Sequence, residues 1–202
     1  MERNENGLLK NNQQLGVIIC RMQVPYLTDS HQKMIKTVQD RHPRILILLG
    51  VAKDSQITER DPFTYDFRKQ MLQQYLRPHD DIQGLLDCPE SDEKWVKLLD
   101  HTVEIYCFPG ETAILYGGRE SFIPYYLGHG GLFKTQELAP AENDSGTALR
   151  EIVATLPPIY SPDAACAILW YQKKLREQGI LVEVQKKDPE DDELQNITKT
   201  FR

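Results

Sequence analysis

The sequence lacks the motifs most often found in nucleotide-binding, zinc-binding and membrane-spanning proteins. It has no GxxxxGK[ST] loop and no GxGxxG loop, and its four cysteines include no CxxC pair. The N-terminal stretch MERNENGLLKNN has no apolar signal core, and no apolar run approaches about 20 residues. We therefore expect a cytoplasmic protein with reduced thiols. The sequence predicts no protein ligands for a metal and no contact with a membrane.

Positive charge is also scarce. The chain has 24 Lys and Arg against 30 Asp and Glu, for a formal net charge of −6. This balance disfavours a nucleic-acid-binding module, although a local cluster of arginines can still bind a small anion. With 202 residues, of which 40% are hydrophobic, the chain is long enough for one domain with a sizeable core. The oligomeric state stays open, a homo-oligomer included.

Hydrophobic periodicity predicts strands that alternate with helices. Strands are expected at 15–20, 44–50, 82–87, 103–108, 112–116, 132–138 and 179–185. Helices are expected at 32–38, 67–76, 89–101, 164–175 and, after a loop, within 144–156. The alternation predicts an α/β fold, a Rossmann-like doubly wound parallel sheet with helices on both faces. We expect a polar arm at 1–14, one domain at 15–186 and a charged tail at 187–202.

Residues 15–38 are typical of a buried strand, a polar loop and an amphipathic helix. Three residues offer a side-chain oxygen that can cap this helix: Thr28, Asp29 and Ser30. His31 then lies at or near the helix N-terminus, where free backbone N–H groups and the helix dipole favour phosphate. Arg21 and Gln23 follow the strand and are expected to point into the same crevice. Such folds bind ligands beyond the carboxyl ends of the strands, at the switch point.

Two stretches resemble the paired signatures of the nucleotidyltransferase superfamily that includes the nicotinamide mononucleotide adenylyltransferases. The matching residues are Arg21, Met22, Gln23 and His31 in an HxGH-like motif, and Ser145, Gly146, Thr147 and Arg150 in an SxTxxR-like motif. Three further segments follow the order of the family: ERDPFTYDFRKQML with Arg60, DCPESDEKWV after Asp87 with Trp95, and YGGR with Gly117 and Gly118. The archaeal-type enzymes and the homologous domain of phage and bifunctional enzymes are the most similar branch.

The first motif departs from the family pattern in three places. Cys20 replaces a Gly, Thr28 stands where the first His would be, and Ser30 replaces the second Gly. The loop between Gln23 and His31 is also two residues longer. Thr occurs at the first His position in the pantetheine-phosphate adenylyltransferases. A Gly at the second position lets phosphates approach the backbone, which a Ser restricts.

The resemblance implies adenylyl transfer from ATP to nicotinamide mononucleotide, which gives NAD and pyrophosphate, with Mg²⁺ bound to ATP. It implies catalytic roles for His31, Thr28 and Arg150. It implies ATP contacts for Arg21, Met22, Gln23, Arg60, Ser145, Gly146 and Thr147. It implies acceptor contacts for Asp87, Trp95, Gly117 and Gly118. Trp95 also fits a helix core face, and His42, His79 and His101 are expected to be solvated.

Two alternatives stay open. The chain could transfer a nucleotidyl group to another phosphorylated acceptor, because the acceptor is read by the least well matched segments. It could also be a catalytically silent, nucleotide-binding regulatory protein, because the first motif carries the three departures described above.

Overall fold

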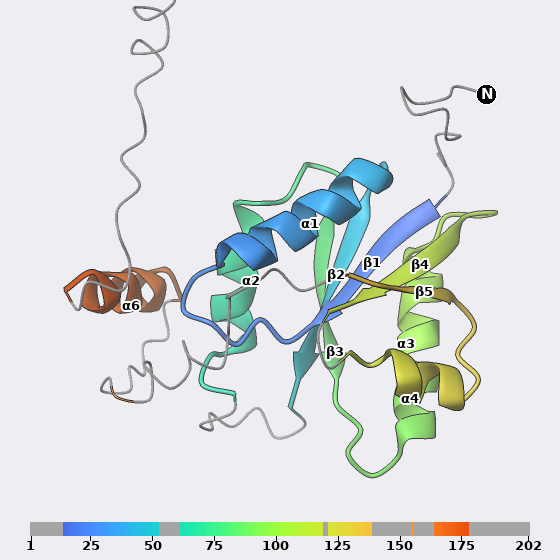
Figure 1. Ribbon diagram of the computed structural model, residues 1–202. Helices are drawn as coiled ribbons and strands as arrows, with labels where there is room; N and C mark the ends of the chain where they lie inside the picture. Colours follow the sequence, from blue (N-terminus) through green and yellow to red (C-terminus); the bar gives the residue numbers. More distant parts are fainter. Residues whose placement is uncertain (1–13, 53–60, 119–120, 139–154, 156–163, 178–202) are drawn as a thin grey trace, which may run out of the picture.

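The computed structural model describes residues 14–52, 61–118, 121–138, 155 and 164–177 (Figure 1). Its centre is a five-stranded sheet with the order β3-β2-β1-β4-β5, and every neighbouring pair is parallel. The strands are β1 (Gln14–Cys20), β2 (Ile45–Val51), β3 (Asp81–Leu86), β4 (Thr112–Gly117) and β5 (Lys134–Glu137). The helices are α1 (Asp29–Arg41), α2 (Tyr65–Gln73), α3 (Asp92–Tyr106), α4 (Ile123–Gly128) and α6 (Ala164–Glu177).

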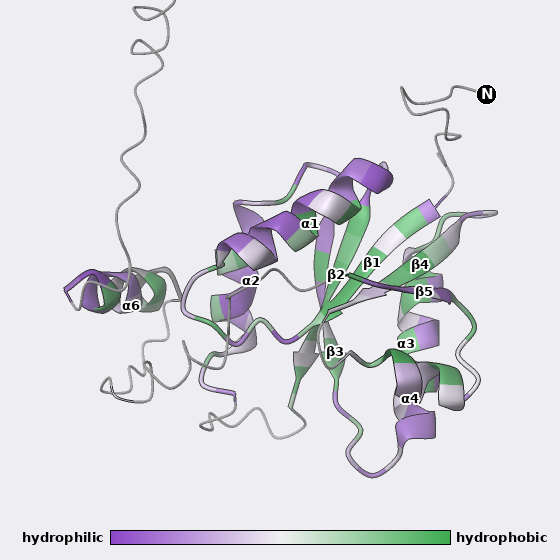
Figure 2. Ribbon diagram, viewed as in Figure 1, coloured by the Kyte–Doolittle hydropathy of each residue, from purple (hydrophilic) through white to green (hydrophobic). Residues whose placement is uncertain are grey.

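Helices cover both faces of the sheet. Ile18 and Ile47 belong to the core cluster shared with α1, α2 and α6, whereas Val17 and Leu48 belong to the cluster shared with α3 and α4. A strand buried on both faces needs apolar residues at nearly every position, which explains the continuous runs in β1 and β2. Figure 2 shows these strands as hydrophobic and the outer helix faces as largely hydrophilic. The predicted α/β doubly wound architecture is therefore confirmed.

Most element predictions within the described residues are confirmed, but the strand expected at 103–108 is wrong. Residues 103–106 form the end of α3. Val103 lies four residues after Leu99, and both are fully buried, so the apolar pattern continues the period of the helix. Arg44 then donates to the carbonyl of Tyr106 at the helix end. The strand expected at 179–185 lies outside the described residues, as does all but one residue of 144–156.

His42 was expected to be solvated, and this expectation is wrong. Its side chain is 4% exposed and contacts both β1 and β4 from the end of α1. Nδ1 donates to the Gln14 carbonyl at 3.1 Å, so neutral Nε2 accepts from the Tyr116 hydroxyl at 2.8 Å. Gly16 makes room for this ring, because a Cβ there would come within 2.7 Å of it. Both ring nitrogens are thus used to hold α1 against the sheet.

This buried imidazole predicts a loss of stability in mild acid. Burial lowers the pKa of His42, and the nearby charges of Arg41 and Arg77 lower it further. The unfolded chain therefore binds a proton more readily than the folded chain, so the free energy of unfolding is largest above about pH 6.5 and falls below it. Urea unfolding from about pH 8 to about pH 5 should show the decline in the wild type and a weaker decline in His42→Leu. An equal decline in both proteins would contradict this assignment.

A second buried polar pair ties α3 to the turn before β5. The Tyr126 hydroxyl donates to Asp100 and accepts from the Phe133 N–H at 2.9 Å. Burial raises the pKa of Asp100, and Gly131 allows the tyrosine ring to lie against the backbone. This contact fixes α4, which follows the end of β4. None of the helices in the described ranges has the length and hydrophobicity needed to cross a bilayer.

Candidate functional site

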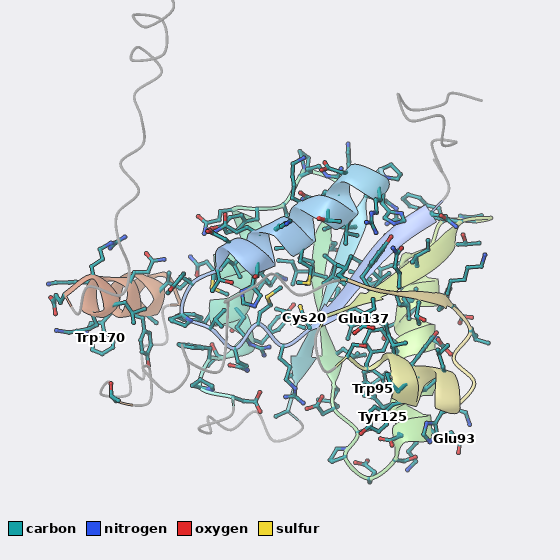
Figure 3. The ribbon with its side chains drawn as sticks, in the orientation of Figure 1. Cys20, Glu93, Trp95, Tyr125, Glu137 and Trp170 are labelled. Carbon is teal, nitrogen blue, oxygen red and sulfur yellow. The ribbon has the colours of Figure 1, made fainter. Side chains whose placement is uncertain are left out.

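The candidate site lies at the carboxyl edge of the sheet, where the strand order reverses. From β1 the chain continues to β2 on one side, and β4 lies on the other side. The crevice between the carboxyl ends of two such strands is the usual ligand site in open α/β sheets. Figure 3 labels Cys20, the last residue of β1, at this edge. Arg21 follows β1 directly, and Gly117 ends β4.

Arg21 is the centre of an ion cluster. Its two terminal nitrogens donate to Asp61 at 3.0 Å and to Asp87 at 2.5 Å. Desolvation lowers the pKa of Arg21, but the pairs with Asp87 and Asp61 outweigh it, so the pKa is raised overall. Gly50 lies beside this side chain, and a Cβ there would be 3.3 Å from Arg21 Cγ. Arg21 was expected to contact ATP and Asp87 to contact the acceptor; the structure pairs the two with each other.

The two residues after Arg21 turn the chain sharply. Met22 is 4% exposed and has a φ of 49°, in the left-handed region that non-glycine residues seldom adopt. Such backbone strain is concentrated at functional sites. Gln23 is also 4% exposed, and its side-chain oxygen accepts from the Phe63 N–H at 3.0 Å. Gln23 therefore holds the loop after β2, and its predicted contact with ATP stays a prediction.

Thr28 and His31 form a pair at the start of α1. Thr28 occupies the N-cap position, but its side chain makes no capping hydrogen bond. Its hydroxyl instead lies 2.7 Å from His31 Nδ1. Thr28 is buried and His31 partly exposed, so the threonine holds the imidazole in place. The ring sits in the first turn of a helix of 13 residues, where the partial positive charge is greatest.

Trp95 packs on the other face of the sheet, whereas Gly117 and Gly118 lie at the carboxyl end of β4. Trp95 is partly buried in α3, and its ring centroid is 6.0 Å from that of Phe122. A Cβ on Gly117 would come within 2.7 Å of Ser121, so this glycine has a packing role, whereas a Cβ on Gly118 would meet nothing within 4 Å. Figure 3 labels Trp95 on α3. The roles of Trp95, Gly117 and Gly118 in acceptor binding stay predictions.

Several expected site residues lie outside the described part of the chain: Arg60, Ser145, Gly146, Thr147 and Arg150. Among the described ranges, no group of three His, Cys, Asp or Glu side chains is arranged to hold a metal ion. Burial raises the pKa of Cys20 to about 12, so this thiol is neutral and a poor nucleophile near pH 7. Cys20 is therefore not the nucleophile of this site, whose described side chains are hydrogen-bond donors and carboxylates.

No protein-family model matches the sequence, and no curated protein matches it. Solved structures do. Two are a bifunctional NMN adenylyltransferase/ADP ribose pyrophosphatase from Francisella tularensis, one of them complexed with AMP and a manganese ion; both are 16% identical, with TM-scores of 0.63 and 0.61. The alignments cover 86% and 83% of this chain and 58% and 52% of theirs. A third is a NadR protein complexed with NAD and AMP-PNP, at 14% identity and a TM-score of 0.51, with 69% of this chain and 42% of that one covered.

The chain has the fold of these adenylyltransferase structures. It spans about half the length of the Francisella tularensis chains. At such low identity, the likeness concerns the adenylyltransferase fold alone.

Sequence reasoning missed three residues at or beside the ion cluster. Asp61 pairs with Arg21, Gly50 makes room for it, and Arg68 lies behind it with 2% of its surface exposed. Asp61 and Arg68 both belong to the DPFTYDFR segment that resembles the family pattern, and this was the available signal. Gly50 ends the apolar run of β2, where a side chain would crowd the edge of the crevice.

Proposed function

We propose that the protein transfers an adenylyl group from ATP to nicotinamide mononucleotide, which releases pyrophosphate and gives NAD. The observation that carries this proposal is the Thr28–His31 pair at the N-terminus of α1, at the switch point of an adenylyltransferase-like fold. The ion cluster of Arg21, Asp61 and Asp87 lies at the end of β1, the strand that precedes α1. These groups suit the binding of phosphates more than the activation of a nucleophile.

The proposed reaction needs positioning and charge stabilisation. The phosphate of the acceptor attacks the α-phosphorus of ATP, the bond to the bridging oxygen breaks, and pyrophosphate takes that electron pair. When the Thr28 hydroxyl donates to Nδ1, the ring hydrogen of neutral His31 is on Nε2, which would donate to the phosphates as charge develops. The N–H groups of α1 act on the same charge.

The charged side chains of the described site cancel one another, so binding the anionic phosphates of ATP needs further arginines. Arg21 and Arg68 are matched by Asp61 and Asp87, so these four side chains contribute no net charge. Arg60 and Arg150 are proposed to supply the remaining positive charge for ATP, with Ser145, Gly146 and Thr147 forming the loop before Arg150. ATP would carry Mg²⁺ on its own phosphates, as is usual for this ion. The ion would neutralise phosphate charge there.

One assay distinguishes between the possible acceptors. Pyrophosphate release is measured with ATP and each of several phosphorylated acceptors, including nicotinamide mononucleotide and phosphopantetheine. We expect release with nicotinamide mononucleotide at least tenfold faster than with the others, on the order of the discrimination one binding pocket provides. Faster release with another acceptor would replace the proposed substrate. ATP binding without release would favour a regulatory protein.

Trp95 tests the acceptor pocket. If its exposed edge stacks on the nicotinamide ring, Trp95→Ala should raise the Michaelis constant for nicotinamide mononucleotide about tenfold, as stacking of a base on an aromatic side chain contributes about 1–3 kcal/mol. The constant for ATP should not change. The packing of Trp95 on Phe122 also predicts a lower melting temperature. Phe122→Leu is the matched control, since it loosens the same packing without removing the indole. A lower melting temperature with unchanged constants in Trp95→Ala would exclude Trp95 from the pocket.

A further inference from the structure

Arg68 is a buried cation that bonds to backbone. It lies on α2 and is 2% exposed. One terminal nitrogen donates to the carbonyls of Arg21 at 2.6 Å and Gly50 at 2.9 Å, and Nε donates to that of Thr64 at 3.3 Å. Burial lowers the pKa of Arg68, and the carboxylates of Asp61 and Asp87 counteract part of that effect. Burying a guanidinium is costly unless it is hydrogen-bonded, and here three of its five N–H groups donate to backbone carbonyls.

The three carbonyls belong to separate elements that meet at the candidate site. Arg21 is the first residue after β1, Gly50 lies near the end of β2, and Thr64 caps α2. A planar guanidinium fixes both the distance and the direction of its partners, which a lysine ammonium does not. Arg68 therefore holds the ends of two neighbouring strands to the start of a helix.

The contact with the Arg21 carbonyl bears on the site itself. It fixes the peptide between Arg21 and Met22, just before the left-handed turn at Met22. The Arg21 side chain leaves the same backbone and reaches two carboxylates. If that peptide rotated, the guanidinium of Arg21 would point elsewhere.

We propose that Arg68 is a positioning residue: it fixes the backbone of Arg21, so that the Arg21 side chain is held where the phosphates of the substrates would bind. This inference rests on the proposed function. Arg68 does not touch the substrate; it acts through the backbone of Arg21. Its effect on turnover should therefore disappear when Arg21 has lost its guanidinium.

A double-mutant cycle tests the proposal. Arg68→Lys keeps the charge but loses the fork, and we expect it to lower kcat about tenfold or more, since small misplacements in a site have effects of this size. In the Arg21→Met background, Arg68→Lys should change kcat by less than about twofold, because groups that act as a unit are not additive. An equal fold-decrease of kcat in both backgrounds would show that Arg68 is a structural residue. An unchanged kcat in both would contradict the positioning role.

Arg77→Lys is the matched control. Arg77 also donates to two backbone carbonyls, those of Gln39 and His42, but near the start of β2. We expect it to lower the melting temperature and leave kcat unchanged. All variants are assayed below their melting temperatures, and Arg68→Lys is compared with Arg77→Lys at a similar loss of stability. A loss of kcat in Arg77→Lys equal to that in Arg68→Lys would overturn the proposal.

The two proposals fail in different ways. If the wild type releases no pyrophosphate with any acceptor, the proposed function fails, and the same cycle is then measured as the dissociation constant for ATP. Arg68→Lys should weaken ATP binding only when Arg21 is present. The same weakening in the Arg21→Met background would contradict the positioning role. Absence of ATP binding by the wild type would contradict both proposals.

Discussion

Replacing His31 with Ala should lower the rate of adenylyl transfer by about 10²–10³, the usual effect of losing one donor to developing charge. Two observations support this role: His31 lies in the first turn of α1, and the Thr28 hydroxyl is 2.7 Å from its Nδ1. Its side chain is only partly buried, so the free energy of unfolding should change by less than about 1 kcal/mol. Single-turnover rates at saturating ATP, with a thermal melt, measure both quantities.

Two further variants sharpen the test of His31. His79→Ala changes an exposed histidine in the loop before β3 and should leave the rate as it is. Thr28→Val removes the hydroxyl that holds Nδ1 and should reduce the rate by less than His31→Ala does. If His31→Ala kept its activity within about threefold of the wild type, a donor role of the usual size would be excluded.

Arg21→Met should have an effect at least as large, a loss of about 10³ in kcat/KM. The substitution removes a guanidinium, a group that can donate two charge-assisted hydrogen bonds to phosphate oxygens. It also removes the positive charge beside the carboxylates of Asp61 and Asp87, where the phosphates would bind, and like charges repel. Because Arg21 is 38% exposed, its ion pairs contribute only about 0–1 kcal/mol to stability. The loss should therefore appear in kinetics far more than in the melting temperature.

The carboxylates provide the control for Arg21. In Arg21→Met with Asp87→Asn, one negative charge is removed, and part of the lost kcat/KM should return. A further loss in the double variant would show that Asp87 itself contacts a substrate. Arg21→Met with wild-type kinetics would contradict the placement of the phosphate site at the end of β1.

The sequence predicted the architecture because each buried strand carries its own signal. The runs in β1 and β2 are apolar at nearly every position, as a strand covered on both faces requires. The segment VEIYCF misled because its residues favour strands, whereas its packing continues the helix from Leu99 to Val103. Local preference was overridden there by the helix that precedes it.

The site was harder to predict, because its contacts join distant parts of the chain. Arg21 was expected from its motif, but its partners lie 40 and 66 residues away, and no local pattern specifies such pairs. His42 was misjudged for the same reason, since its partner Tyr116 is 74 residues away. The Thr28–His31 pair is local, and its position at the start of a helix was anticipated from the spacing.

The proposed adenylyl transfer can be followed directly by ³¹P NMR of ATP and nicotinamide mononucleotide with the purified protein and Mg²⁺. We expect the ATP signals to decline while the signals of the NAD diphosphate and of free pyrophosphate grow in equal amounts. The reaction should be far slower with His31→Ala. Unchanged ATP, or conversion to ADP and inorganic phosphate without NAD, would contradict the proposed transfer.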